Sequence, residues 1–235
     1  MSDYKVRKIL YFEKPGPHNT DNVIRITKER IKEGDIKFAV VASISGKTAL
    51  KLAQKLKGLD VSVVCVSGFP GWLTIHKIKH PFVRGKIRER LEKLKVPIVE
   101  TTPSTLSGDT IDYSLARYGY IPASWVMAET LEALGGYGLK TAVEVILMAT
   151  DCGIVHPSVN VLSIAGTDKG ADTAIVAKST FSSWTFSEDS SRRFQVLEII
   201  AMPHTKKWYK RIGVGGLSFQ EIEKGETIGT GAETL

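Results

Sequence analysis

The stretch from residue 38 to residue 56 most constrains the fold of this chain. It opens with five small or apolar residues, 38–42, which have the length and pattern of a strand buried on both faces. A polar turn over residues 43–46 follows, and the helix expected after it repeats apolar residues on one face, at Leu50, Ala53 and Leu56. A buried strand, a short turn and an amphipathic helix in this order predict an α/β fold with a parallel sheet.

The turn itself carries the residues of an anion site, namely Ser43, Ser45, Gly46, Lys47 and Thr48. Hydroxyl and ammonium groups donate hydrogen bonds, and a glycine lets the backbone approach a ligand closely. The first N–H groups of the helix lack backbone partners, and the helix dipole places partial positive charge there. The turn therefore predicts a site for the phosphate of a small ligand. Two simpler interpretations remain open: Ser45 or Thr48 can cap the helix, and Lys47 can be a solvated side chain.

The turn is not the P-loop of nucleoside triphosphatases. That motif has a glycine at the position that Val41 occupies here. No aspartate suited to bind magnesium follows at the end of a later strand. The sequence therefore disfavours a nucleoside triphosphatase.

The whole chain has 235 residues, of which 43% are hydrophobic and 24% charged, as in a soluble globular protein. This length fits one large domain or one domain with an extension. We predict a single α/β domain over residues 1–202, with a helical insertion at about 109–137. Residues 203–235 are glycine-rich and first basic, then acidic; we expect a C-terminal extension that is partly disordered or acts as the arm of a homo-oligomer.

The formal net charge of +7 comes from Lys and Arg spread along the chain, which is typical of a solvated surface. The densest basic stretch, 77–95, also contains glutamates and has no aromatic ladder for stacking bases, so we expect no nucleic-acid partner. No apolar run approaches the roughly 20 residues of a membrane span, and the N-terminus is no signal peptide. Cys65 and Cys152 have no metal-ligand spacing and do not indicate a disulfide framework. We therefore expect a cytoplasmic protein without a membrane partner.

Strand and helix patterns alternate along the chain and predict a three-layer α/β fold, with a mostly parallel sheet and helices on both faces. Strands are expected at residues 7–12, 38–42, 61–66, 96–99, 158–164, 173–179 and 194–202. Besides the helix after the turn, helices are expected from the capping residues 19–21 to Gly34, and at 83–94, 109–118, 124–134 and 139–150. The short connection between 158–164 and 173–179 predicts a hairpin and hence an antiparallel edge.

Glycine and hydroxyl residues follow four of these strands. Because ligands of parallel sheets bind beyond the carboxyl ends of the strands, we predict a pocket formed by the turn and by loops 67–72, 102–108 and 163–173. The residues expected to line it, besides those of the turn, are Gly68, Phe69, Thr102, Ser104, Gly166, Thr167, Gly170 and Asp172. Phe69 or Trp72 can cover an aromatic ring of the ligand, or the loop can be a hydrophobic turn packed on a neighbour. Asp168 or Asp172 can bind a ribityl or ribose hydroxyl, or can cap a turn.

The histidines provide no catalytic set. His76 and His80 are four residues apart and can share a helical face as a metal pair, but Pro81 and the nearby lysines favour a surface turn. His156 comes before the strand at 158–164, at its amino end and away from the expected pocket. No order of Ser, His and Asp stands out, and Gly-x-Ser-x-Gly is absent. The catalytic residues, if the protein is an enzyme, stay unknown, and no metal is predicted.

The order of elements and the turn together resemble the C-terminal domain of pyruvate kinase, over residues from about 20 to 177. That family holds a phosphate of its sugar-bisphosphate effector with a Thr/Ser-x-Ser-Gly-Arg/Lys-Ser/Thr turn, which the Ser-x-Ser-Gly-Lys-Thr of residues 43–48 matches. The chain has no room for the catalytic barrel of pyruvate kinase, so that reaction is not implied. A closer resemblance is to a small family of stand-alone archaeal proteins of unassigned activity that carry this domain, and it implies FMN as a ligand.

Three functions are consistent with these patterns. The first is a cytosolic protein that binds FMN or a related phosphorylated small molecule through Lys47 and the helix N-terminus. The second is an enzyme, either a flavin-dependent oxidoreductase or one that processes phosphate esters. The third is a regulatory module that senses a sugar phosphate. The sequence does not decide between them.

Overall fold

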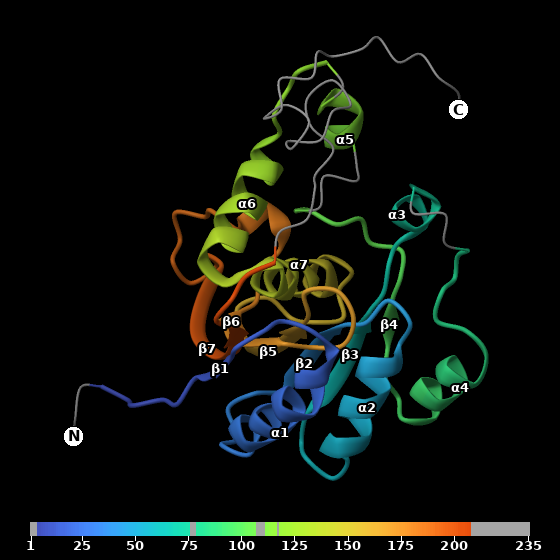
Figure 1. The fold of residues 1–235 in the computed structure, drawn as a ribbon, viewed down its shortest axis with the longest axis vertical. Coiled ribbons are helices and arrows are strands. Elements are labelled where there is room, and N and C mark those ends of the chain that lie inside the picture. The colour runs from blue at the N-terminus through green and yellow to red at the C-terminus, as the bar shows by residue number, and fades with distance from the viewer. Residues whose placement is uncertain (1–3, 76–78, 107–110, 117, 208–235) are drawn as a thin grey trace.

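Seven strands form one sheet in the computed structural model, which describes residues 4–75, 79–106, 111–116 and 118–207 (Figure 1). The order across the sheet is β1-β7-β6-β5-β2-β3-β4. The strands are β1 (Leu10–Phe12), β2 (Phe38–Ala42), β3 (Ser62–Val66), β4 (Ile98–Val99), β5 (Asn160–Ala165), β6 (Thr173–Lys178) and β7 (Gln195–Pro203).

Six of these strands point the same way. β2 pairs in parallel with β3 and with β5, and β3 pairs in parallel with β4. β6 is antiparallel to both β5 and β7, and β1 pairs in parallel with β7. The predicted mostly parallel sheet with an antiparallel edge is confirmed: the antiparallel pairs are β5-β6 and β6-β7, on the side of the sheet that ends in β1.

The helices cover both faces of the sheet, as expected for three layers (Figure 1). α1, α2 and α4 pack through one hydrophobic cluster on one face, and α6 and α7 pack through a second cluster on the other. The bounds are α1 (Thr20–Ile31), α2 (Lys47–Leu56), α3 (Pro70–Ile75), α4 (Gly85–Lys93), α5 (Ile111–Ala116), α6 (Ala123–Gly135) and α7 (Tyr137–Asp151), with 3₁₀ turns at Pro17–Asn19 and Ser182–Trp184. No helix in the described part of the chain is long and apolar enough to span a bilayer.

β2 shows why its sequence is a continuous apolar run. Ala39 and Val41 belong to the cluster under α1 and α2, whereas Val40 belongs to the cluster under α7. Successive side chains of a strand point to opposite faces, so a strand covered on both sides needs apolar residues at every position. This burial holds β2 in place, and the turn at residues 43–46 follows directly from its carboxyl end.

Three local details differ from the sequence prediction. Residues 67–72 were expected as a loop, but α3 begins inside them at Pro70, where a proline suits the first turn of a helix. The strand expected at 96–99 is shorter, since β4 has only two residues. The strand expected at 7–12 begins as β1 only at Leu10. The expected extension begins inside β7, which ends at Pro203; residues 208–235 lie outside the described residues.

A buried arginine connects α1 to β7 through hydrogen bonds. Arg30 donates to both carboxylate oxygens of Asp35, at 2.6 and 2.9 Å, and to both of Glu198 in β7, each at 2.9 Å. The hydrogen bonds from the Arg30 guanidinium hold the pKa of Asp35 at about 2, below its ordinary value of 3.8. This network links the last turn of α1 to β7.

Candidate functional site

The sheet has a switch point between β2 and β5. From the carboxyl end of β2 the chain passes through α2 to β3 on one side, and from the carboxyl end of β5 it turns through a hairpin to β6 on the other (Figure 1). Because the two strands are parallel and adjacent, both connections leave from the same edge. In open α/β sheets, ligands bind outside the carboxyl ends of the strands, at such a switch point. The predicted turn 43–48 and the predicted loop 163–173 border this point.

The turn is built by its first serine. The backbone N–H of Ser43 donates to Val66 O at 2.8 Å, which keeps the turn beside β3. The Ser43 hydroxyl accepts from the N–H groups of Thr48 at 3.2 Å and Ala49 at 3.3 Å, so it caps α2. Ser45 and Thr48 were the capping alternatives left open by the sequence. In the structure Gly46 is the N-cap residue, and the hydroxyl that accepts from the helix N–H groups belongs to Ser43.

Gly46 closes the turn in a left-handed conformation, with φ +76°, and its N–H donates to Ser43 O at 3.0 Å. A Cβ at this position would lie 2.9 Å from Ile87 Cγ2 and 3.0 Å from both Leu91 Cδ1 and Val83 Cγ1. The glycine is therefore required by its φ and by the close packing of α4. The sequence predicted that Gly46 lets the backbone approach a ligand; in the structure its α-carbon lies close to side chains of α4.

Several donors of the turn are not used by the fold in the described part of the chain. Within the described residues, no hydrogen bond occupies the N–H groups of Ile44, Ser45 and Lys47 or the hydroxyls of Ser45 and Thr48. Lys47 is exposed and begins α2, where the dipole of a ten-residue helix presents partial positive charge. These groups can bind a phosphate without breaking any bond of the fold.

The loop after β3 supports the turn from the side. The Ser67 hydroxyl donates to Ile44 O at 2.8 Å. Gly68 lies against α3, because a Cβ there would be 2.7 Å from Trp72 Cε3 and 2.9 Å from Leu73 Cδ2. Phe69 is only 7% exposed and packs inside the protein. Of the two aromatic residues predicted to cover a ring, Trp72 is the half-buried one.

The segment after β4 contributes Thr102, which is half-buried, and Ser104, which is buried. The Ser104 hydroxyl donates to the Glu144 carboxylate of α7. At the start of this segment Glu100 accepts two hydrogen bonds from Arg88 of α4, both at 2.6 Å. Next to these groups, burial raises the pKa of the Cys65 thiol to about 12, and the Glu100 charge acts in the same direction. The thiol therefore stays protonated.

The hairpin between β5 and β6 is organised by Asp172, which is fully buried. Its Oδ2 accepts from Gly16 N at 2.9 Å and from Thr167 N at 3.1 Å, and its Oδ1 accepts from the Thr173 hydroxyl at 2.9 Å. Asp172 thus joins the hairpin to the β1–α1 loop. The capping alternative matches these contacts, since the carboxylate binds protein groups.

The two predicted glycines of the hairpin are packing positions. Gly166 faces Gly170 O, which a Cβ would approach to 2.6 Å. Gly170 has φ +73° and lies against Pro17 and Thr20, at 2.7 Å from Pro17 Cα for a built Cβ. The hairpin therefore sits on the β1–α1 loop, a wall of this edge that sequence reasoning missed. The signal that marks it is the Pro-Gly-Pro of residues 15–17, which places a glycine where a buried carboxylate needs an N–H.

Sequence reasoning also missed two charged residues of α7. Lys140 and Glu144 are buried and form an ion pair, with Lys140 Nζ 3.0 Å from Glu144 Oε2. Their spacing of four on a helix was a readable signal, because such residues are neighbours on one face. Surface ion pairs share that spacing, so burial could not be read from it.

His18 lies in the 3₁₀ turn of the β1–α1 loop, and His204 follows the carboxyl end of β7. His156 stacks edge-on with Phe38, at 6.1 Å between ring centroids, at the amino end of the sheet as predicted. His76 is outside the described residues, so the proposed pair with His80 is not described. Among the residues that the structure describes, no group of three His, Cys, Asp or Glu side chains could hold a metal ion.

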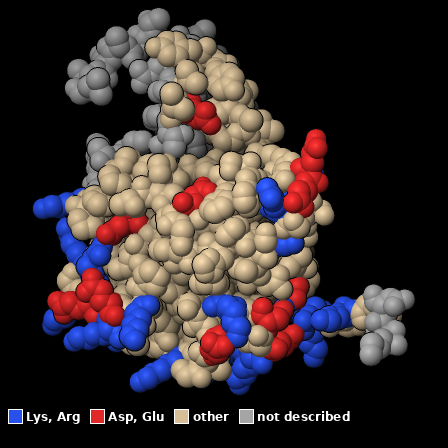
Figure 2. Space-filling model, turned by 180° about the vertical axis from the view of Figure 1, so that it is seen from behind, with Lys and Arg blue, Asp and Glu red and all other residues tan. Residues whose placement is uncertain are grey.

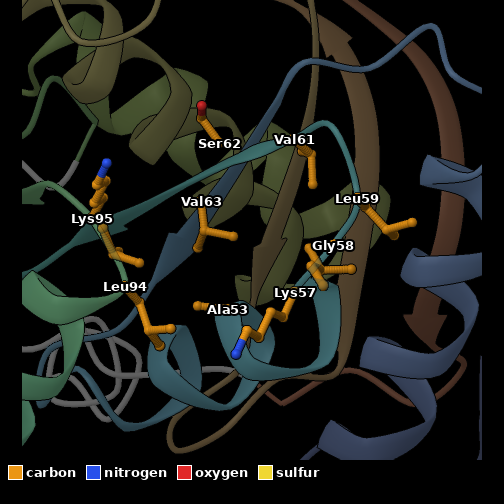
Figure 3. Close-up of a pocket in the computed structure, with 11 residues that line it drawn as sticks. Ala53, Lys57, Gly58, Leu59, Val61, Ser62, Val63, Leu94 and Lys95 are labelled. Carbon is orange, nitrogen blue, oxygen red and sulfur yellow. The ribbon is translucent and has the colours of Figure 1, made fainter.

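A cleft of about 310 Å³ lies at the opposite edge of the sheet (Figure 3). It is formed by the end of α2, the start of β3 and the end of α4, with Ala53, Gly58, Val61 and Leu94 among its lining residues. A helix of ten residues is about 15 Å long, so this cleft and the turn lie at opposite ends of α2. Lys57 and Lys95 also line this cleft, beside the C-termini of α2 and α4, which carry partial negative charge.

Charges of both signs mix on the face drawn in Figure 2, where Lys and Arg lie among Asp and Glu around the lower part. This face carries no continuous basic field of the kind that follows a nucleic-acid backbone.

No known family model matches the sequence. The resemblance to the pyruvate kinase C-terminal domain therefore stays a prediction, and the class that the coordinates define is a three-layer α/β protein with a mostly parallel sheet.

Proposed function

We propose that this protein binds a phosphorylated small molecule at the carboxyl edge of its sheet, and that FMN is the first ligand to test. The observation that carries this proposal is the set of N–H groups at Ile44, Ser45 and Lys47, which have no partner within the described residues and lie at the N-terminus of α2. They stand next to the switch point between β2 and β5. Backbone N–H groups at a helix N-terminus beside a lysine suit a dianionic phosphate.

The donor set fits the phosphate of FMN. Ser45 and Thr48 add hydroxyls, and Lys47 adds an ammonium group that is open to solvent. Trp72 and Thr102 are half-buried residues of the neighbouring loops, and we expect them to border the rest of the ligand. Phe69, Ser104 and Asp172 support these loops from inside, because their side chains are buried in the protein. When bound, FMN would supply the redox chemistry, while the chain holds the phosphate and shapes the walls.

The test compares three proteins by visible absorbance and by titration with FMN. In the double variant Lys47→Ala, Ser45→Ala we expect a loss of affinity of about tenfold or more, because hydrogen bonds to a charged group contribute about 1.5–3 kcal/mol each. The control Lys55→Ala removes the same charge at the far end of α2 and should bind like the wild type. Unchanged affinity in the double variant would remove the turn from the site.

The other two functions are outcomes of the same experiment. A yellow protein whose colour bleaches with reduced nicotinamide would indicate a flavin-dependent oxidoreductase. A colourless protein that ignores FMN but is stabilised by a sugar bisphosphate would indicate a sugar-phosphate sensor. Any ligand that binds only the folded state at 100 times its Kd should stabilise it by about 2.7 kcal/mol, so a thermal shift detects each case.

A further inference from the structure

The segment after β4 is held by a charged side chain from α7. Glu144 is 5% exposed, and its Oε1 accepts hydrogen bonds from the Ser104 hydroxyl and from Leu106 N, the latter at 3.2 Å. Its Oε2 accepts from Lys140 Nζ at 3.0 Å. Lys140 is 1% exposed, and its ammonium lies 5.3 Å from the centroid of the Tyr137 ring. One carboxylate therefore links the buried ammonium of α7 to two groups of the segment 100–106.

Stability alone does not explain this arrangement. Removing two charges from water is costly, and a buried ion pair replaced by apolar residues of similar volume is often as stable or more stable. An apolar pair, however, cannot accept hydrogen bonds from the segment. What Glu144 adds is a fixed, charged acceptor for Ser104 and Leu106, and hydrogen bonds to charged groups are stronger than neutral ones.

The segment in turn borders the carboxyl edge. It leaves β4 at Val99, next to β3, whose own end feeds the loop that bonds to the turn through Ser67. The segment carries Thr102, which is half-buried, whereas the Ser104 hydroxyl is turned to Glu144. Holding Ser104 and Leu106 fixes where Thr102 lies relative to the turn.

We propose that Glu144 is a positioning residue of the ligand site: it fixes the segment 100–106 against α7, and its ion pair with Lys140 holds the carboxylate toward the segment. The predicted effect on affinity rests on the proposed function, in which this edge binds FMN. The predicted effect on the position of the segment 100–106 is independent of that function. Glu144 itself touches no ligand in this account.

The test uses two matched double variants of the full chain. Lys140→Met with Glu144→Leu removes the charges and the acceptor, whereas Lys140→Met with Glu144→Gln removes the charges but keeps a carbonyl oxygen in place of Oε1. The two proteins differ at one position, where glutamine offers the segment an acceptor and leucine does not. Hydrogen exchange of the backbone amides of residues 100–106 and titration with FMN are measured on both, together with thermal unfolding.

We expect the leucine variant to exchange these amides about tenfold faster than the glutamine variant and to bind FMN about tenfold more weakly, the loss expected for hydrogen bonds of this kind. Equal exchange and equal affinity in two folded variants would overturn the proposal. If the leucine variant does not fold, Ser104→Ala, which removes one of the two bonds, must show faster exchange than wild type, and unchanged exchange there would also overturn it. If wild type binds no FMN, the proposed function fails, and the exchange comparison still decides whether Glu144 positions the segment.

Discussion

Replacing Gly46 by alanine tests the packing of the turn against α4. The backbone there is left-handed, with φ +76°, and a Cβ would approach Val83 Cγ1, Ile87 Cγ2 and Leu91 Cδ1 to 3.0, 2.9 and 3.0 Å. These atoms surround the position and come from branched side chains that are themselves packed. The new methyl group can be accommodated only by moving α4 or the turn, so we expect a less stable protein.

The size of the effect has two parts. A left-handed conformation costs a residue with a Cβ about 1–2 kcal/mol relative to glycine. Inserting a methyl group into a well-packed region costs about 1–3 kcal/mol more. The sum, about 2–5 kcal/mol, corresponds to a fall in Tm of roughly 5–20 °C for a chain of this size.

Gly58→Ala is the matched control. Gly58 follows α2 at its other end with φ +87°, and a Cβ there has nothing within 4 Å. This variant should lose only the conformational part, about 1–2 kcal/mol. Urea and thermal unfolding of both variants give the comparison, and FMN titration of the alanine variant at position 46 reports whether the turn has moved. If the two alanines destabilise the protein equally, the packing of α4 on the turn is not what requires the glycine.

Two further predictions concern titration and reactivity. Because Arg30 lowers the pKa of Asp35 to about 2, the stability from this pair is present above the ordinary value of 3.8 and is lost as pH falls from about 4 to about 2; Asp35 is 45% exposed and the pair is screened, so the loss is about 1 kcal/mol or less. Unfolding of Asp35→Asn should show a smaller loss in that range, and an identical pH profile would contradict the assignment. Cys152 is exposed, whereas Cys65 is buried with a pKa raised to about 12, so a thiol reagent should label one cysteine in the native protein and two in denaturant. Labelling of the native Cys152→Ser variant would contradict this.

The central layer of the fold was readable from the sequence because its strands are covered on both faces. Residues 38–42 and 61–66 are apolar at nearly every position, and only a strand with helices on both sides requires this. The position of β1 in the sheet could not be predicted from the sequence. It is the first strand in the chain but pairs with the last, at the edge away from β4, and a pairing across the whole chain leaves no local pattern.

The positions of the strand-end loops could be predicted from the sequence, whereas the contacts that their side chains make could not. Strand ends with glycine and hydroxyl residues indicated the carboxyl edge, which is where the switch point lies. The use of each side chain depended on partners distant in sequence. Asp172 meets Gly16 across 156 positions, and Ser104 meets Glu144 across 40. Neither separation has a periodic signature, so neither contact could be predicted.

The hydroxyl groups closest to the strand ends bond to other protein groups, which reduces the number of groups that could contact a ligand. Ser43 caps α2, Ser67 bonds to Ile44 O, and Ser104 bonds to Glu144. Parallel strands end in loops whose N–H and C=O groups lack ladder partners, and a hydroxyl next to the strand satisfies the nearest of these groups first. Further along the turn, the N–H groups of Ser45 and Lys47 and the hydroxyls of Ser45 and Thr48 have no hydrogen-bond partner within the described residues. A phosphate at this edge would therefore be bound by the outer part of the turn, and the inner hydroxyls would set its shape.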